Sequence, residues 1–122
     1  MAAHRYWRIY CTAANNGSAG LCELELRSSH NGSDLTGSGT SISSSGSCDN
    51  VFDDMNYSGS WNNGPPCWVG YDFGSGNSYD IVEFVITAKN DSWYNQSFRD
   101  FSLQYSDTVS YTHLTLPTKR IV

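Results

Sequence analysis

The chain has 122 residues, of which 39% are hydrophobic and 16% are charged, enough for one domain with a modest core and too few for two domains. Acidic residues outnumber basic residues by 12 to 7, so the net charge is -5, and no cluster of Lys or Arg offers the positive surface that phosphate binding requires. No apolar run approaches the length that spans a bilayer, and the first residues lack the apolar core of a secretion signal. We therefore expect one domain with no nucleic-acid partner, no membrane span and no signal peptide.

In chain order, the first two predicted strands cover residues 7–11 and 22–26. Every second residue is apolar, as in a strand with one buried face, with the odd positions inward in the first strand and the even positions inward in the second. The loop 12–20 contains Asn15-Asn16-Gly17, which has turn chemistry, so we expect the two strands to pair as a hairpin. The segment 28–47 is rich in Ser, Gly and Asn and has few apolar anchors.

The second half of the chain predicts three further strands. A loop at 49–66 precedes a strand in 67–74, the turn 74–77 precedes a strand at 81–88, and the loop 89–97 precedes the last strand. The side chains expected to face inward are Val69, Tyr71, Phe73, Val82, Phe84, Ile86, Ala88, Phe101, Leu103 and Tyr105. No segment has helical periodicity, so we predict an all-β fold, an antiparallel β-sandwich or jelly roll.

The end of the chain has the sequence of a translated library adapter. Residues 109–118 can be read back into DNA as GTC TCT TAT ACA CAT CTG ACG CTG CCG ACG, the transposase mosaic end and adapter of tagmentation sequencing. The alternative is a genuine edge strand rich in Thr and Leu. We expect a C-terminally truncated domain at residues 1–107 and an adapter-derived tail at residues 108–122, which contributes nothing to function.

Five motifs together resemble the discoidin family, also called the coagulation factor five/eight type C domain. In order they are Arg5-Tyr6-Trp7-Arg8-Ile9, Leu21-Cys22-Glu23-Leu24-Glu25-Leu26, Val51-Phe52-Asp53-Asp54 leading to Trp61, Trp68-Val69-Gly70-Tyr71-Asp72-Phe73-Gly74, and Phe101-Ser102-Leu103-Gln104-Tyr105-Ser106-Asp107. The resemblance spans residues 5–107 and implies the galactose-binding-like jelly-roll fold. The first two motifs resemble strands that usually close the family's domain, so the order is that of a circular permutation, similar to modules of phage tails and other virion proteins.

The resemblance implies that the motif aromatics are structural. It places Trp7, Trp68, Tyr71 and Phe73 in the core. Trp61 matches a family tryptophan that follows the first loop of the binding end, where packing is again the more frequent role.

The resemblance also implies a structural calcium ion at one end of the sandwich. The matching carboxylates are Asp53 and Glu23, with backbone carbonyls from Asn50, Met55 and Cys22, and such oxygen donors suit a hard cation. The family's usual Asp-Gly is Asp53-Asp54 here. The alternative is that Asp53 caps a turn and Glu23 is a solvated strand residue.

One loop contains every group that sugar recognition needs. Aromatic faces can cover the apolar side of a pyranose, and amides, carboxylates and Arg can pair with its hydroxyls. The candidate sugar-binding residues are Asn90, Asp91, Trp93, Tyr94, Asn95, Gln96 and Arg99. The alternative is that Trp93 and Tyr94 tuck under their own loop, and the loop 57–66 is a second candidate.

Catalytic motifs are missing from the sequence. Outside the tail, the only imidazoles are His4 and His30, and neither has a nucleophile in a recognisable context. No glycine loop has the pattern that holds phosphate, and the four cysteines form no CxxC or His/Cys cluster, so we expect free thiols and no zinc. We predict that the protein is not an enzyme.

The features together favour a non-catalytic recognition module. It would bind a glycan or a cell-surface polysaccharide through loops at one end of the sandwich, on a virion or an extracellular surface. The alternative is a structural or protein-docking domain of a phage tail or virion, with other virion proteins as partners and no small ligand.

Overall fold

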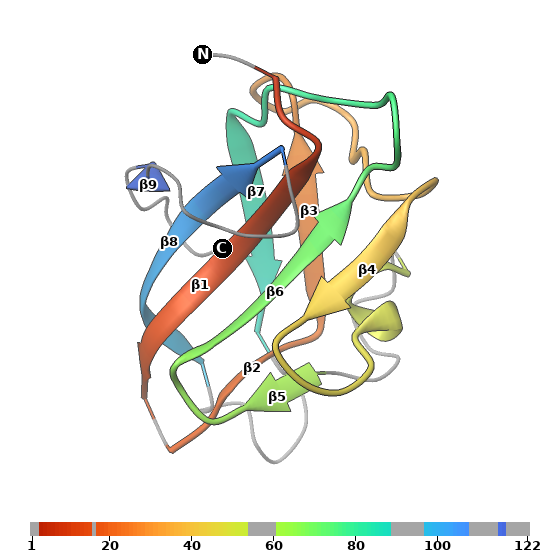
Figure 1. Cartoon of the computed structure of the whole chain (residues 1–122). Helices are drawn as coiled ribbons and strands as arrows, with labels where there is room; N and C mark the ends of the chain where they lie inside the picture. Colours follow the sequence, from red (N-terminus) through yellow and green to blue (C-terminus); the bar gives the residue numbers. More distant parts are fainter. Residues whose placement is uncertain (1–2, 16, 54–60, 89–96, 108–114, 117–122) are drawn as a thin grey trace.

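The structure is a computed structural model that describes residues 3–15, 17–53, 61–88, 97–107 and 115–116 (Figure 1). These residues form nine strands and one turn of 3-10 helix, η1 (Asp49–Phe52), and they contain no α-helix. The strands are β1 (Tyr6–Ala14), β2 (Ala19–Leu21), β3 (Glu23–Arg27), β4 (Thr40–Ser43), β5 (Trp61–Asn63), β6 (Cys67–Asp72), β7 (Glu83–Thr87), β8 (Phe98–Ser106) and β9 (Thr115–Leu116). The all-β prediction is confirmed.

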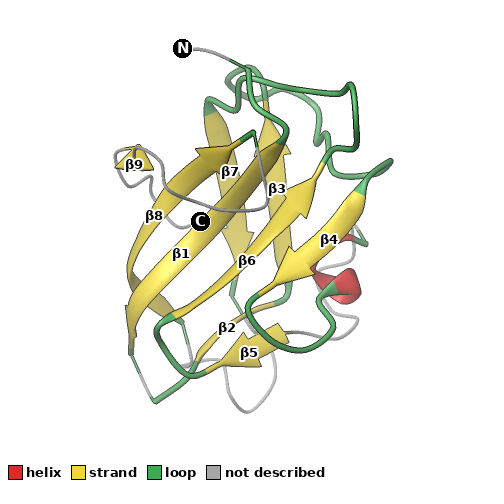
Figure 2. Ribbon diagram, in the orientation of Figure 1, coloured by secondary structure: helices red, strands yellow, loops and turns green. Residues whose placement is uncertain are grey.

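The strands form a two-layered, sandwich-like arrangement. The front layer is a five-stranded sheet in the order β4-β6-β1-β8-β9, and all its neighbours are antiparallel. Behind it lies the antiparallel pair β3-β7, and the short pair β2-β5 crosses one end of the molecule (Figure 2). In the part of the chain that the structure describes, no helix is long and apolar enough to cross a membrane.

The core lies between the two layers and follows the alternation of the strands. In β1 the odd-numbered side chains Trp7, Ile9 and Cys11 are fully buried, as predicted. The other strands contribute Leu24, Leu26, Val69, Tyr71, Phe84, Ile86, Phe101 and Leu103 to the same cluster. Burying each large apolar side chain contributes about 1.5–3 kcal/mol, so the paired layers account for most of the stability.

Trp7 connects the start of the chain to the segment between β6 and β7. Its indole N–H donates to the carbonyl oxygens of His4 at 3.1 Å and Tyr79 at 3.0 Å. The His4 ring stacks on Tyr105, with 3.9 Å between the ring centroids. Trp7 therefore fills the core with its ring and satisfies two backbone carbonyls with its nitrogen.

An ion pair fastens the last residue of β6 to the segment that precedes β1. The Arg5 Nε and Nη2 atoms donate to the two Asp72 carboxylate oxygens at 2.7 and 3.1 Å, and the Gly74 N–H donates to Asp72 Oδ1 at 2.8 Å. The guanidinium of Arg5, together with this N–H group, holds the pKa of Asp72 below its usual value. The predicted turn 74–77 begins here, and its glycines Gly74 and Gly76 have φ angles of 98° and 82°.

The predicted hairpin between residues 7–11 and 22–26 is wrong. β1 pairs with β6 on one side and with β8 on the other, whereas β3 pairs with β7. The chain leaves the front sheet after β1, forms β2 against β5, and enters the rear layer as β3. The strand that follows β1 along the chain is therefore not its partner, and the segment predicted as the second half of the hairpin belongs to the other layer.

Two expected positions need correction. Val82 is 39% exposed, because β7 begins only at Glu83 and the preceding Ile81 fills the core instead. Trp68 is only partly buried, because its buried neighbours Cys67 and Val69 place it on the opposite face of β6.

The weakly patterned segments and the tail also contain strands. Segment 28–47 contributes β4, which pairs with β6, and the loop 49–66 contributes η1 and β5. Within the tail, Leu116 pairs with Leu103 and Thr115 pairs with Gln104 on the outer edge of β8. The adapter origin of residues 108–122 and the domain boundary at 107 stay predictions.

Candidate functional site

The outer face of the front sheet carries the even-numbered side chains of β1. Ile9 and Cys11 point into the core, so Arg8, Tyr10 and Thr12 point away from it. The same alternation in β8 buries Phe101 and Leu103 and leaves Asp100 and Ser102 on the outside. Because Tyr10 pairs with Ser102 in the β1-β8 ladder, the outward groups of the two strands lie next to each other.

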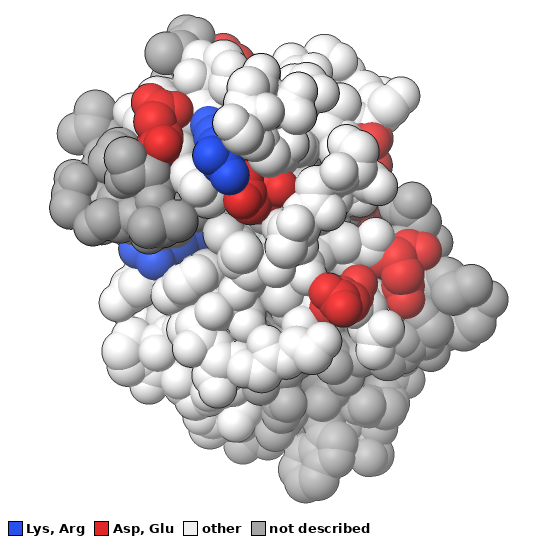
Figure 3. Space-filling view, turned by 45° about the vertical axis from the view of Figure 1, so that its right-hand side comes forward, with Lys and Arg blue, Asp and Glu red and all other residues white. Residues whose placement is uncertain are grey.

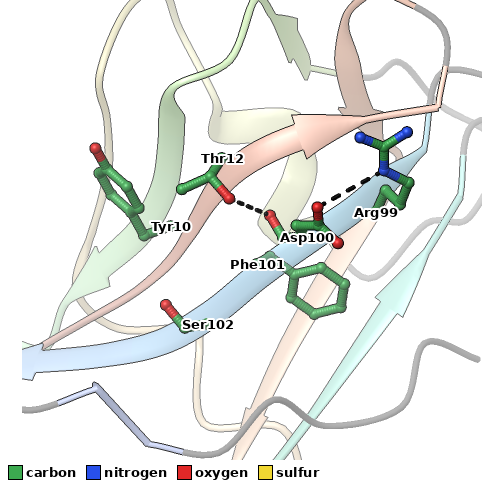
Figure 4. Close-up of a pocket in the computed structure, with 6 residues that line it drawn as sticks. All are labelled: Tyr10, Thr12, Arg99, Asp100, Phe101 and Ser102. Carbon is green, nitrogen blue, oxygen red and sulfur yellow. Dashed lines mark hydrogen bonds and ion pairs between the residues drawn. The ribbon is translucent and has the colours of Figure 1, made fainter.

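A hollow of about 390 Å³ lies on this face, where β1 approaches its end and β8 begins. Tyr10 and Thr12 from β1 line it together with Arg99, Asp100, Phe101 and Ser102 from β8 (Figure 4). We call it the Tyr10 hollow. Its volume falls within the range of roughly 300–1,000 Å³ that is usual for small-ligand sites.

An irregularity in the strand ladder creates the hollow. Cys11 pairs with Phe101, but the next pair is Ala13 with Asp100, so Thr12 is an extra residue in β1. The Thr12 hydroxyl donates to the Asp100 carbonyl oxygen at 3.3 Å (Figure 4). A bulge of this kind bends its strand and redirects side chains, which explains why polar groups converge here.

The charges of the Tyr10 hollow are balanced. Arg99 Nε lies 3.7 Å from Asp100 Oδ2, and the two side chains are 57% and 63% exposed. An ion pair so exposed contributes about 0–1 kcal/mol, so a ligand could replace it at little cost. The hollow thus presents a phenol ring, two aliphatic hydroxyls, a carboxylate and a guanidinium with no net charge.

Next to the hollow, the Arg8 guanidinium packs against two aromatic rings on the same face. The Arg8 guanidinium carbon lies 4.9 Å from the centroid of the Tyr10 ring and 5.0 Å from that of Trp68. Arg8 Nε also donates to Gln104 Oε1 at 2.8 Å, which fixes the side chain across the sheet. We call Trp68, Arg8 and Tyr10 the Arg8 stack, and its Tyr10 ring also forms one side of the hollow.

The predicted sugar-binding residues are only partly within the described residues. Asn90, Asp91, Trp93, Tyr94, Asn95 and Gln96 lie outside them. Arg99 is described, and it lines the Tyr10 hollow. Its neighbours Tyr10, Thr12, Asp100 and Ser102 were not predicted as site residues, although the alternation of the two predicted strands already placed Tyr10 and Ser102 on the outer face.

The predicted calcium ligands come from elements that lie together. β3, which carries Glu23, contacts η1, which contains Asn50 and directly precedes Asp53. Glu23 is 1% exposed, so it is not the solvated strand residue of the alternative interpretation. Met55 lies outside the described residues, which contain no group of three or more His, Cys, Asp and Glu side chains that could hold a metal ion.

The donor chemistry of this region fits a hard cation. Two carboxylates and the backbone carbonyls of Asn50 and Cys22 are oxygen donors of the kind that Ca²⁺ prefers. A carboxylate as deeply buried as that of Glu23 also needs a compensating charge or hydrogen bonds.

A second, smaller hollow of about 160 Å³ lies beside β4 and η1. Its polar groups bond to one another: the Gly39 N–H donates to the Tyr71 hydroxyl at 2.6 Å, and the Ser41 hydroxyl donates to Asp49. These bonds hold the segment before β4 onto the sheet, so we assign this hollow a structural role.

The described residues offer little continuous positive charge on the face that Figure 3 presents. Figure 3 shows described Lys and Arg side chains only as small separate patches on the face it presents, most of which is uncharged. This face would give a nucleic-acid backbone few contacts, and the exclusion of nucleic acid stays a prediction.

Comparison with known proteins gives no relative. No family model matches the chain, no curated protein is significantly similar in sequence, and no solved structure is significantly similar in fold. The fold and the site geometry are therefore the basis for any statement about function.

Proposed function

We propose that this chain is a non-catalytic carbohydrate-recognition module and that it binds a neutral pyranose of a glycan or polysaccharide in the Tyr10 hollow. The observation that carries the proposal is the meeting of a phenol ring, two aliphatic hydroxyls, a carboxylate and a guanidinium around one small hollow. The resemblance to the discoidin family, with its galactose-binding-like jelly roll, supports the same function.

The chemistry of the hollow suits a sugar better than an ion. A pyranose has an apolar face that can pack on Tyr10, and its hydroxyls can donate to Asp100 and accept from Arg99. Balanced charge gives no advantage to a phosphate or another strong anion.

The site would extend in two directions from the hollow. Arg99 follows the loop that holds Asn90 to Gln96, so those residues could contact the same glycan. On the other side, the Trp68 ring of the Arg8 stack offers a second apolar surface near Tyr10. Location on a virion or another extracellular surface follows from the resemblance and is part of the proposal.

A glycan array probed with the full chain tests the proposal. We expect binding to a limited set of glycans, reduced at least about tenfold by Thr12→Ala, Arg99→Ala and Trp93→Ala, because each removes a sugar contact worth roughly 1.4 kcal/mol or more. Thr40→Ala is the matched control for Thr12→Ala, since Thr40 is an exposed threonine on β4 outside the hollow.

Two outcomes would reject the proposal. Binding that survives both Thr12→Ala and Arg99→Ala would place the sugar elsewhere. Absence of binding to every glycan on the array would favour the alternative, a structural or protein-docking domain of a phage tail or virion without a small ligand.

We also propose a structural Ca²⁺ held by Glu23 and Asp53 with neighbouring carbonyls. The supporting observation is the burial of Glu23 on a strand that contacts η1. We expect 1 mM Ca²⁺, relative to a chelator, to raise the melting temperature by about 5 °C, because an ion that binds only the folded state stabilises it by mass action.

Removal of the Glu23 carboxylate tests this second proposal, because the proposed ion needs that ligand. Glu23→Gln should abolish the response to Ca²⁺, whereas Glu25→Gln should retain it, because Glu25 is on the same strand but is paired with Arg27 at 2.8 Å. Equal melting temperatures with Ca²⁺ and with chelator in the unmodified protein would show that no such ion binds.

A further inference from the structure

Two of the four cysteines face each other across adjacent strands. Cys11 of β1 and Cys67 of β6 are directly opposite in the antiparallel ladder, and both are free thiols. Opposed residues in such a ladder have Cα atoms about 4.5–5.5 Å apart, within the range of about 4.4–6.8 Å that a disulfide bond spans. Both side chains are buried on the same face, with exposures of 0% and 1%.

We infer that Cys11 and Cys67 form an oxidisable pair, which becomes an intramolecular disulfide bond between β1 and β6 when the protein meets a small-molecule disulfide. The proposal is independent of sugar binding. It concerns a covalent link under the outer face, since Cys11 lies between Tyr10 and Thr12 in the sequence of β1.

The two thiols interact in a way that favours this reaction. A hydrogen bond from the Cys67 thiol lowers the pKa of Cys11, and the same contact together with burial raises the pKa of Cys67. The Cys11 Sγ atom also lies 3.1 Å from the Ala13 carbonyl oxygen, next to the bulge at Thr12. Cys11 is thus the better nucleophile, and Cys67 stands where it can complete the bond.

The other described cysteines have no such partner position. Cys22 lies between β2 and β3, where its N–H donates to the Thr87 carbonyl oxygen at 2.8 Å. Cys48 directly precedes η1, and burial raises the pKa of its thiol. Neither residue is opposite a cysteine in a strand ladder of the described residues.

Oxidised glutathione, a disulfide reagent, is the oxidant in this reaction. The Cys11 thiolate attacks one sulfur of the reagent, which forms a mixed disulfide and releases one reduced glutathione. The Cys67 thiolate then attacks Cys11 Sγ, which forms the protein disulfide and releases the second glutathione. The two protons lost by the cysteines end on the two released thiols, and the protein loses two electrons to the reagent.

Both thiols are buried, so the oxidant reaches them through local opening near the ends of the strands. Cys67 is the first residue of β6, and Cys11 lies beside the irregular end of β1. Local opening of strand ends needs less free energy than global unfolding, so the pair can react without loss of the fold.

The test compares the full chain after incubation with oxidised glutathione and after reduction. Free thiols are alkylated in denaturant, and the products are identified by intact mass and peptide mapping. We expect the reduced protein to carry four alkyl groups and the oxidised protein to carry two, with one peptide pair joined through Cys11 and Cys67. The oxidised form should melt about 5 °C or more above the reduced form, because the link closes a long loop of the unfolded chain.

Matched variants separate this pair from the other thiols. Cys22→Ala and Cys48→Ala should still form the bond, and Cys67→Ser should stop at the mixed disulfide or stay reduced. Four alkylated cysteines after oxidation of the unmodified protein would overturn the proposal, as would a bond that joins any other cysteines.

Discussion

Replacement of Gly70 by alanine is expected to destabilise the fold by about 3 kcal/mol, because the front sheet leaves no room for a side chain there. Gly70 lies opposite Arg8 in the β1-β6 ladder. A Cβ atom at this position would overlap the Trp7 carbonyl oxygen and lie 2.7 Å from Arg8 Cβ and 2.8 Å from Arg8 Cα. These neighbours belong mainly to backbone, so relief requires β1 and β6 to separate. Urea unfolding monitored by tryptophan fluorescence measures the change.

Gly37→Ala is the matched control for Gly70→Ala. Gly37 is exposed, and a Cβ built on it meets no atom within 4 Å. We expect the unfolding midpoint of Gly37→Ala to equal that of the unmodified protein or to exceed it, because alanine restricts the unfolded chain more than glycine does. Equal midpoints for Gly70→Ala and the unmodified protein would mean that β1 and β6 are not as close as the structure places them.

The strands themselves could be predicted from the sequence because a half-buried strand has a strict period of two. The alternation of Trp7, Ile9 and Cys11, and of Phe101 and Leu103, determines which side chains face the core, and all five are buried. The all-β class follows from such patterns without knowledge of which strands pair.

Strand pairing could not be predicted in the same way. β1 pairs with β8 across more than half of the chain, and the period of two contains no information about the partner. The turn signal at Asn15-Asn16-Gly17 favoured a local hairpin, because a turn shows that the chain reverses but not which layer it enters. The prediction that Val82 faces the core was wrong because the apolar run at 81–82 begins before β7 does.

The residues that line the Tyr10 hollow could be predicted only in part, for physical reasons that differ from residue to residue. Arg99 was predicted because it follows a loop rich in sugar-binding groups, and it does line the hollow. Thr12 was assigned to a loop, because an extra residue in a strand ladder becomes visible only when the partner strand is known. Trp68 was assigned to the core by resemblance, although the inward positions of Val69 and Tyr71 already indicated the outer face.

Two tryptophans on neighbouring strands should lose very different amounts of stability when each is replaced by alanine, and the contrast tests both the fold and the site. Trp7→Ala is expected to cost about 4 kcal/mol in the free energy of unfolding, since Trp7 is fully buried and donates to two carbonyl oxygens. Trp7→Phe should cost about 1–3 kcal/mol, because the ring volume largely remains while the N–H is lost.

Trp68→Ala is expected to cost no more than about 1 kcal/mol, because the partly buried Trp68 ring packs on Arg8 at 5.0 Å outside the core. The same variant should weaken glycan binding severalfold if the ligand extends from the Tyr10 hollow onto the Arg8 stack, whereas Trp7→Phe should bind normally while it remains folded. Urea unfolding and the glycan array, applied to both variants, measure the two effects separately. A large loss of stability in Trp68→Ala would place this ring in the core, as the resemblance implied, and would remove the stack from the proposed site.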